Sequence, residues 1–263
     1  MHAYVNIAVN AARVAGNLLC RALNDLEQVQ MSSKNLNDYV TSADKAAEKA
    51  ICKIIHEYYP DHKILAEESG FSGNQESEVE WIIDPLDGTT NFIHGIPHFA
   101  ISIAVRVKNR VEHAVIYDPV REELFTASRG EGARLNNVRI RIGKQKTLEG
   151  SLLATGFPFK DHSKLDLWQQ TFGALFLSCS DVRRAGSAAL DLAYLAAGRL
   201  DGFWEFGLQP WDIAAGALLV SEAGGIVEDL HGKPDYLNSG NIIAANPKIF
   251  KAMLQKLNPI LKK

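Results

Sequence analysis

Two aspartates three residues apart follow an apolar run, and a glycine and two threonines come directly after them. The run Trp81–Ile83 is typical of a buried strand, and it leads into Asp84 and Asp87. Carboxylates at the end of a buried strand are costly to desolvate unless a cation or strong hydrogen-bond donors accompany them. The backbone N–H groups of residues 88–90 would point outward from a helix N-terminus, where anions are favoured. Cation ligands beside an anion-binding helix start indicate metal-assisted attack on a phosphate ester.

Two further carboxylates, Glu67 and Asp212, stand where a predicted element ends or begins. Glu67 follows a strand, and Asp212 lies in the first turn of a helix that starts at Pro210. Sites in layered α/β proteins gather at such junctions. A single aspartate at a helix start is commonly a cap, so Asp87 and Asp212 also have a purely structural interpretation. Four acids in these positions favour an all-oxygen site for Mg²⁺, or for Mn²⁺ in its place, over a zinc site.

The elements that must position these acids differ between the two halves of the chain. An amphipathic helix is expected over residues 5–26 and a second one from Thr41 or Ser42 to Tyr58, with a polar break at 32–39 between them. Short strands follow at 63–66, 79–83, 99–107, 111–117 and 123–127, with a hairpin between the third and the fourth. We therefore expect an α+β half over residues 1–150 that carries the metal signature.

Beyond about residue 150, strands and helices alternate, which is typical of α/β structure. Strands are expected at 151–154, 181–184, 202–205, 225–227 and 242–244. Helices are expected at 163–177, 187–197, 210–222 and 247–257. Residues 151–263 would thus form an α/β half that completes the site, within one integrated fold that has no flexible linker.

Composition excludes several classes of function. The chain has 263 residues, of which 46% are hydrophobic, an ordinary value for a globular core. A net charge of −3 gives no support to general nucleic-acid binding, which needs a basic face. Three widely spaced cysteines are typical of buried free thiols in a reducing compartment. No apolar run is long enough to span a bilayer and no secretory signal is evident, so we expect a cytoplasmic protein without a membrane partner.

The motifs resemble the signatures of the inositol monophosphatase family. Its first signature, Asp-Pro-(Ile/Leu)-Asp-Gly-Thr-Thr-Asn-Phe, is matched at every position of residues 84–92. Its second, Trp-Asp-x-x-Ala-Gly followed by an apolar helix and Glu-Ala-Gly-Gly, is matched at 211–216 and 222–225, and its Glu-Glu-(Ser/Thr) element at 67–69. The resemblance covers nearly the whole chain and is strongest to the bacterial extragenic-suppressor type. It implies a five-layer α-β-α-β-α sandwich of the inositol monophosphatase and fructose-1,6-bisphosphatase type.

The resemblance also implies the ligands of two or three magnesium ions. Glu67, Asp84 and the backbone carbonyl of Leu86 would hold the first ion. Asp84, Asp87 and Asp212 would hold the second. Two such metals can clamp the attacking and leaving oxygens of an in-line displacement by water.

The same resemblance assigns the catalytic and phosphate contacts. Glu67 with Thr89 would position and deprotonate the attacking water, beside Asp84. The backbone N–H groups of Gly88 and Thr89 would bind the phosphoryl oxygens. Leu86, Asp87 and Asp212 would also contact the ester.

Substrate selection is expected from the second half of the chain. Gly186, Ser187 and Ala188 begin a helix whose backbone could touch a polyol ring, and Glu205 matches the family's acceptor for ring hydroxyls. Arg183 precedes that helix and could approach phosphate or ring oxygens, although a solvated arginine is an equal alternative.

The implied activity is Mg²⁺-dependent hydrolysis of myo-inositol monophosphate to inositol and phosphate, with inhibition by lithium. Related enzymes use the same metal centre on fructose 1,6-bisphosphate, histidinol phosphate or a nucleotide 3′-phosphate, so another small sugar or polyol phosphate is the alternative. Glu205 favours a polyol, because a carboxylate accepts hydroxyl protons and repels a second phosphate.

The bacterial type also implies a homodimer and a regulatory role in ribosomal RNA transcription antitermination, through contacts with the transcription machinery. The sequence offers two surface features for such a partner, the basic segment 134–146 and the pair Arg183-Arg184. The alternative for the basic segment is a charged strand edge that discourages strand pairing.

Overall fold

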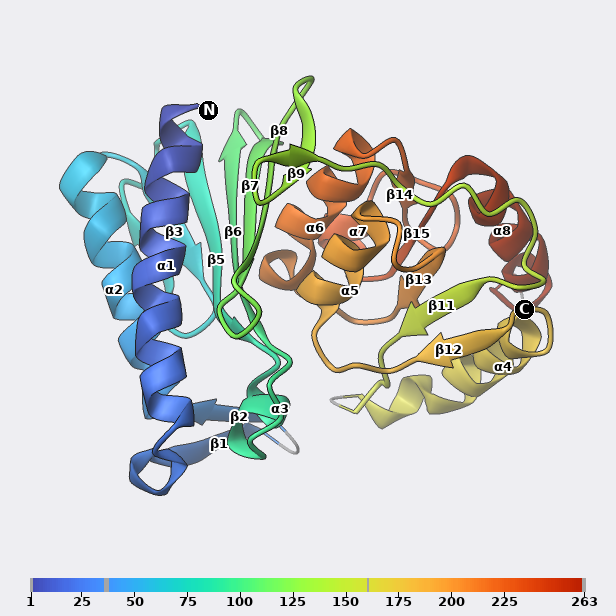
Figure 1. Cartoon of the computed structure of the whole chain (residues 1–263), viewed down its shortest axis with the longest axis horizontal. Helices are drawn as coiled ribbons and strands as arrows, with labels where there is room; N and C mark the ends of the chain where they lie inside the picture. The colour runs from blue at the N-terminus through green and yellow to red at the C-terminus, as the bar shows by residue number, and fades with distance from the viewer. Residues whose placement is uncertain (1, 36–37, 160, 262–263) are drawn as a thin grey trace.

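Five alternating layers of helices and sheets make up the computed structural model, which describes residues 2–35, 38–159 and 161–261 (Figure 1). Two N-terminal helices cover one face of an eight-stranded sheet, and two further helices separate that sheet from a five-stranded one. A last helix pair covers the outer face of the second sheet. The expected five-layer α-β-α-β-α sandwich is thereby confirmed. The helices are α1 (Ala3–Leu23), α2 (Ser42–Tyr58), α3 (Thr89–Ile93), α4 (Leu165–Phe176), α5 (Ala188–Ala196), α6 (Pro210–Glu222), α7 (Tyr236–Ser239) and α8 (Pro247–Leu261).

The first sheet has the strand order β10-β9-β8-β7-β6-β5-β3-β4, in which β3 and β5 run parallel and the other neighbours antiparallel. The hairpin expected at 99–107 and 111–117 is confirmed as β6 and β7. The strands are β3 (Lys63–Ala66), β4 (Gly70–Gly73), β5 (Val79–Asp87), β6 (Ala100–Val107), β7 (Arg110–Asp118), β8 (Glu123–Ser128), β9 (Gly132–Leu135) and β10 (Val138–Arg139).

The second sheet has the order β12-β11-β13-β15-β14, with the first three strands parallel and β15 antiparallel to both of its neighbours. All five expected strands are found, each within one residue at either end. The strands are β11 (Leu152–Thr155), β12 (Asp181–Arg183), β13 (Gly202–Glu205), β14 (Ile226–Glu228) and β15 (Ile242–Ala245).

The polar stretch expected to interrupt the first two helices forms a hairpin instead, with β1 (Met31–Asn35) and β2 (Asp38–Thr41). These two strands form a separate two-stranded sheet and do not belong to either large sheet. Their sequence therefore lacks the alternation of apolar and polar residues from which a strand is predicted. Strands β4, β9 and β10 were also not expected, since they are only two to four residues long.

Small residues let the first layer approach the sheet. Ala8, Ala12 and Ala15 of α1 are fully buried. A Cβ at Gly16 would lie 2.8 Å from Cε1 of Tyr117 in β7, which is closer than real Cβ contacts. Glycine at this position therefore sets how closely α1 can lie against the sheet.

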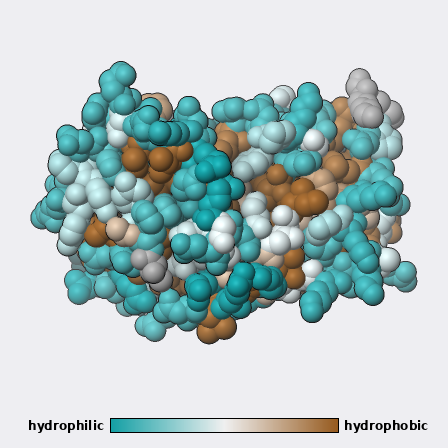
Figure 2. Space-filling view, turned by 90° about the horizontal axis from the view of Figure 1, so that it is seen from above, coloured by the Kyte–Doolittle hydropathy of each residue, from teal (hydrophilic) through white to brown (hydrophobic). Residues whose placement is uncertain are grey.

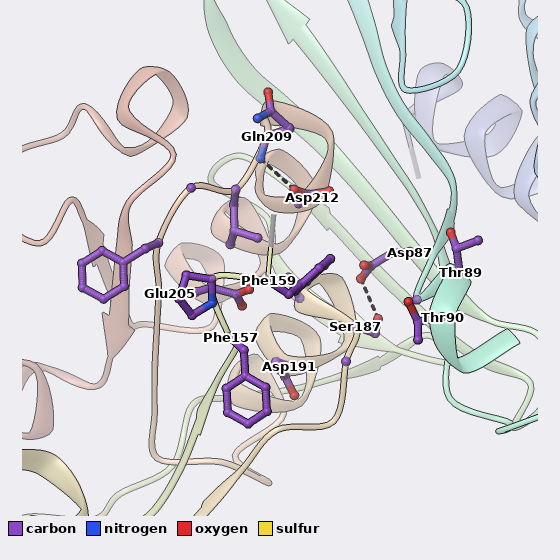
Figure 3. A pocket seen from close by; sticks show the side chains of 18 of the residues that line it. Asp87, Thr89, Thr90, Phe157, Phe159, Ser187, Asp191, Glu205, Gln209 and Asp212 are labelled. Carbon is purple, nitrogen blue, oxygen red and sulfur yellow. Dashed lines mark hydrogen bonds between the residues drawn. The ribbon is translucent and has the colours of Figure 1, made fainter. Parts of the chain in front are cut away.

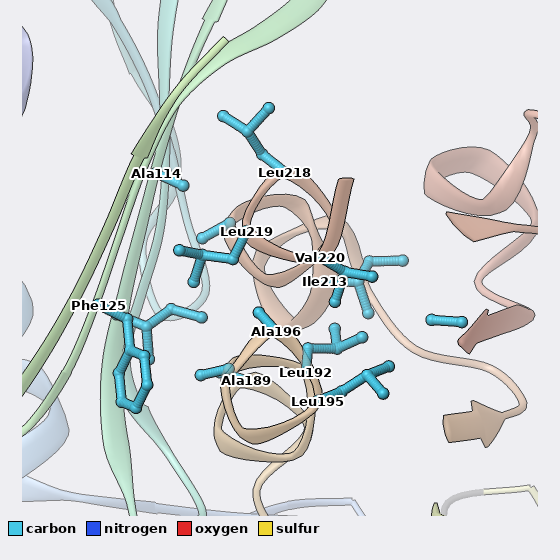
Figure 4. Close-up of a cluster of buried hydrophobic side chains, with 14 of the residues drawn as sticks. Ala114, Phe125, Ala189, Leu192, Leu195, Ala196, Ile213, Leu218, Leu219 and Val220 are labelled. Carbon is cyan, nitrogen blue, oxygen red and sulfur yellow. The ribbon is translucent and has the colours of Figure 1, made fainter. Parts of the chain in front are cut away.

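The middle layer is apolar on almost every side, because it is covered by a sheet on each face. Side chains of α5, such as Leu192 and Leu195, pack beside Leu219 and Val220 of α6 (Figure 4). Phe125 of the first sheet lies in the same cluster. A helix that is apolar on almost all sides is typical of such a buried layer. The layer of α5 and α6 separates the two sheets (Figure 1).

Seen from above, the molecule presents mostly hydrophilic residues, with small separate hydrophobic patches (Figure 2). Within the described part of the chain, no helix combines the length and the apolar character needed to cross a membrane.

Candidate active site

One cavity brings together residues from both halves of the chain. It holds about 170 Å³ and is bounded by the ends of β3 and β5, the start of α3, the N-termini of α5 and α6, and the segment after β11. All four expected acids line it: Glu67, Asp84, Asp87 and Asp212. Figure 3 shows Asp87 and Asp212 from the two halves of the chain on the same cavity.

Asp84 lies inside β5 and not after it, which corrects the expected strand end. The register of β5 against β6 shifts between Asp84 and Asp87, so the strand continues past Pro85 through a bulge. Pro85 has no N–H to donate to a ladder, and a bulge is one of the few places where a strand tolerates proline. Asp84 is buried, and its carboxylate accepts a hydrogen bond from the N–H of Leu86 at 2.9 Å.

Asp87 joins the two halves of the fold. Its Oδ2 accepts hydrogen bonds from the hydroxyl of Ser187 at 2.6 Å and from the N–H of Ala189 at 2.7 Å, both at the start of α5 (Figure 3). Burial raises the pKa of Asp87 to about 6, although these two hydrogen bonds favour the ionised form. Asp87 is therefore not a cap of α3, whose first residue follows Gly88.

Asp212 is both part of a helix cap and a residue of the cavity lining. It is the third residue of α6, and its carboxylate accepts a hydrogen bond from the N–H of Gln209 at 2.7 Å, which completes a capping box. Pro210 opens the helix as expected. The same carboxylate lines the cavity, so capping holds it in place at the site.

The electrostatics of the four acids suit a hard divalent cation. Burial raises the pKa of Asp84 well above its ordinary value, and the charges of Glu67, Asp87 and Asp212 raise it further. Mg²⁺ binds preferentially to negatively charged oxygens. A bound cation would therefore neutralise the repulsion between these carboxylates. Within the described ranges, no three acid, histidine or cysteine side chains are gathered into a ready-made metal cage. The fit to magnesium rests on the chemistry of the donors, which are all carboxylate oxygens, and these carboxylates are spread around the lining of the cavity.

Gly88 shapes the side of the cavity that lies at the start of α3. It has a positive φ of 102°, which favours glycine, and a Cβ there would lie 3.1 Å from the carbonyl oxygen of His98. The conformation directs the chain from β5 into α3, so Gly88, Thr89 and Thr90 all line the cavity.

Asp44 contacts a residue of the cavity lining, and this contact was not expected from the sequence. It lies in the first turn of α2, is fully buried, and forms a capping box with Thr41. Its Oδ1 accepts a hydrogen bond from the hydroxyl of Thr89 at 3.1 Å, and that hydroxyl also lies 3.1 Å from the carbonyl oxygen of Leu86. The pattern Thr-x-x-Asp predicts a helix start, but nothing in it indicates a contact with a residue 45 positions later.

The substrate residues expected from the second half are mostly on the cavity. Gly186, Ser187, Ala188 and Glu205 line it, and Glu205 is 8% exposed. Residues 155–159 and Asp191 line it as well, although neither was expected.

Arg183 does not line the cavity, which corrects the expected position of the arginine. It is exposed on β12 and pairs with Asp181 two residues earlier, on the same side of the strand. Successive side chains of extended chain point to opposite sides, so the next residue faces the site. Arg184 lines the cavity, with its guanidinium 4.9 Å from the ring centre of Phe157 and 5.7 Å from that of Phe159.

Comparisons with known proteins extend over nearly the full chain. The model of the inositol monophosphatase family matches residues 1–262. The Nus factor SuhB of Escherichia coli strain K12 is 56% identical over 257 residues, which cover 98% of this chain and 96% of that protein. The extragenic suppressor protein suhB from Bartonella henselae has a crystal structure that matches with a TM-score of 0.95 and 44% identity, over 97% of this chain and 98% of that one. The inositol monophosphate-bound structure of SaIMPase-II matches with a TM-score of 0.82 and 26% identity, over 98% of this chain and 95% of that one.

Proposed function

The chain belongs to the inositol monophosphatase family, and we propose that it is a magnesium-dependent phosphomonoesterase that hydrolyses myo-inositol monophosphate to inositol and phosphate. The observation that carries the proposal is the convergence of four carboxylates and the start of α3 on one cavity. Cation ligands and an anion-binding backbone side by side are what a phosphate ester and its metal require. The inositol monophosphate bound in SaIMPase-II, which has the same fold, adds support for the substrate class.

The residues proposed to hold magnesium are Glu67, Asp84, the carbonyl of Leu86, Asp87 and Asp212. Bound Mg²⁺ would supply positive charge for the phosphate and the leaving alkoxide and would favour ionisation of water. The hydrogen bonds from Ser187 and Ala189 to Asp87, and from Gln209 to Asp212, orient these ligands. Oriented ligands need less rearrangement when an ion binds.

The attacking water would be positioned by Glu67 and Thr89. We propose that Glu67 takes the proton of this water, since it lines the cavity beside Asp84. Asp44 fixes the Thr89 hydroxyl by accepting its hydrogen bond, so the Thr89 oxygen can itself accept a hydrogen bond from the proposed water. The N–H groups of Gly88 and Thr89 would bind the phosphoryl oxygens at the N-terminus of α3.

The remainder of the ester would lie between the start of α5 and Glu205. Glu205 comes from β13 and accepts hydroxyl protons of the polyol in this proposal. A cavity of about 170 Å³ suits a small ester better than a nucleotide, since larger ligands occupy several hundred Å³. Other small sugar or polyol phosphates are the alternative substrates.

The experiment is phosphate release from a panel of esters with Mg²⁺ and with a chelator. The panel should hold myo-inositol 1-phosphate, fructose 1,6-bisphosphate, histidinol phosphate and a nucleotide 3′-phosphate. We expect hydrolysis that needs Mg²⁺, is fastest on the inositol ester, and is inhibited by lithium. A strong preference for the bisphosphate would replace the proposed substrate, and hydrolysis that is insensitive to chelation would overturn the metal mechanism.

A second proposed role is in transcription antitermination, which the name of the Escherichia coli relative favours. The basic segment 134–146 and the exposed Arg183 are the surface features offered for a partner in the transcription machinery, and β10 within that segment forms the edge of the first sheet. If this role uses the surface, Asp84→Asn should abolish hydrolysis and still rescue an antitermination defect in a deletion strain. Failure of the wild-type chain to rescue that defect would end the proposal. The homodimer stays a prediction, which light scattering of the purified protein would test.

A further inference from the structure

A buried carboxyl group faces the cavity without a hydrogen-bond partner. Asp191 lies on the inner side of α5, is 3% exposed, and lines the cavity (Figure 3). Its backbone N–H bonds to the carbonyl of Ser187, but among the residues that the structure describes its carboxylate accepts no hydrogen bond. The residue is buried in the protein while its side chain borders the cavity, so a hydrogen-bond donor bound in the cavity could serve as the partner of this carboxyl group.

A second buried carboxyl group, that of Glu205, lies across the same part of the cavity. It is 8% exposed and, among the described residues, also accepts no hydrogen bond. A Cβ at Gly156 would lie 1.8 Å from its Oε1, so a glycine there is what leaves room for the carboxyl group. Burial raises the pKa of Glu205, and the charge of Asp191, which lines the same cavity, raises it further.

The guanidinium group of Arg184 lies near these two carboxyl groups. Arg184 lowers the pKa of both Asp191 and Glu205, in opposition to burial, while its guanidinium rests on the ring of Phe157 at the edge of the cavity. Among the described residues that line the cavity, seven carboxyl groups stand against two cationic side chains, those of Arg184 and Lys164, so the cavity is acidic. Hydroxyl groups are the donors that such a pair of acceptors would bind, and an anionic group would be repelled.

We propose that Asp191 is a specificity-determining residue which, together with Glu205, accepts hydrogen bonds from two hydroxyl groups of the alcohol part of the ester. This inference rests on the proposed phosphatase function and adds a residue to its substrate recognition. The acid pair would select a leaving group rich in hydroxyls and would reject one that carries a second phosphate. Asp191 would thus act on the choice of ester and not on the chemical step.

The experiment compares Asp191→Asn and Asp191→Ala with the wild type on three esters. Myo-inositol 1-phosphate supplies hydroxyls, fructose 1,6-bisphosphate supplies a second phosphate, and p-nitrophenyl phosphate has a leaving group without hydroxyls. Asp166→Asn makes the same chemical change on the exposed face of α4 and serves as the matched control.

We expect kcat/KM on the inositol ester to fall about 10-fold or more in Asp191→Ala, mostly through KM, as for loss of a hydrogen bond to a charged group. Activity on p-nitrophenyl phosphate should stay within about twofold of the wild type, since no hydroxyl is lost there. Asp191→Asn should raise the rate on the bisphosphate relative to the inositol ester, because it removes one negative charge. Equal losses on all three esters, or unchanged ratios, would overturn the inference.

Thermal unfolding provides a readout that does not depend on turnover. Because Asp191→Asn removes a buried unpartnered carboxyl group, we expect its melting temperature to rise by about 2–4 °C. A purely structural aspartate would show a fall, which would count against the inference. If the wild type hydrolyses none of the esters, the proposed function fails, whereas a wild type active on all three with unchanged ratios in the variants rejects the role of Asp191 alone.

Discussion

The hydroxyl of Ser187 donates a 2.6 Å hydrogen bond to the carboxylate of Asp87, a residue 100 positions earlier in the chain. The bond connects the end of β5 in the first sheet with the N-terminus of α5 in the middle layer. Ser187 also caps α5 by accepting the N–H of Leu190 at 3.3 Å. One side chain therefore both starts a helix and orients a proposed metal ligand.

Replacing Ser187 with alanine should weaken Mg²⁺ binding. Asp87 would lose one of its orienting donors, and the loss of such a partner typically costs about 10–100-fold in metal affinity. The lost cap should also lower the free energy of unfolding by about 1 kcal/mol. The Mg²⁺ concentration at half-maximal activity measures the first effect and denaturant unfolding the second. Ser187→Thr keeps the hydroxyl and should restore the affinity; if it behaves like alanine, the hydroxyl is not the cause.

Mg²⁺ should raise the melting temperature of the protein, because the proposed site would bind the ion only in the folded chain and the ion would relieve repulsion among the four carboxylates. Asp84→Asn should abolish this rise and lower the rate of hydrolysis by about 10³-fold or more, since charge stabilisation by the metals is lost. Without Mg²⁺, the same variant should melt above the wild type, because its buried repulsive carboxylate is gone. Thermal unfolding with Mg²⁺ and with a chelator checks both statements, with Asp166→Asn as the control. A full Mg²⁺-induced rise in Asp84→Asn would argue against this ligand.

The hydrogen bond from Thr89 to Asp44 should matter for turnover more than for binding. Thr89→Val keeps the side-chain shape but removes the hydroxyl, and loss of a group that positions the attacking water should lower kcat by about 10²-fold with little change in KM. Thr89→Ser retains the hydroxyl and should keep most of the rate. Steady-state kinetics of the two variants separate these outcomes. A change confined to KM would show that Thr89 only binds the ester.

A pH-dependent contribution to stability is expected from Glu123 and Arg199, neither of which lines the cavity. The guanidinium of Arg199 donates hydrogen bonds of 2.6 and 2.5 Å to Glu123 and lowers the pKa of this carboxyl below its ordinary value. The folded state thus binds this proton less readily than the unfolded state, so the stabilisation is complete above the ordinary pKa of 4.5 and is lost as the pH falls through the lowered value.

Glu123→Gln should therefore reduce the free energy of unfolding by about 1 kcal/mol at pH 7, an estimate suited to a partly exposed pair. The difference from the wild type should shrink as the pH is lowered below 4.5. Urea unfolding at several pH values measures it. A difference that is constant with pH would mean that packing, and not charge, is responsible.

The sequence determined those parts of the site that lie within short contiguous segments. Residues 84–92 carry three proposed ligands, the glycine turn and the helix start in nine consecutive positions, so their chemistry and order follow from local structure. The positions of Asp212, two residues after Pro210, and of Glu67, directly after its strand, likewise follow from local sequence. The layer order was predictable from the family signatures, and the strand and helix periodicities located most elements. The elements missed, such as β1 and β2, are those whose pairing leaves no apolar pattern.

The tertiary structure decided which residues meet and which side chains face the cavity. Asp44 reaches Thr89 because α2 packs against the first sheet beside the end of β5, and no local pattern encodes that contact. Arg184 takes the place expected for Arg183 because the phase of a short strand is fixed by its neighbours. In the sequence, Asp191 has no feature that distinguishes it from other helix residues. Only the fold shows that it is buried and lines the same cavity as Glu205. Spacing along a chain fixes only local geometry, whereas burial and orientation depend on what the other layers place alongside.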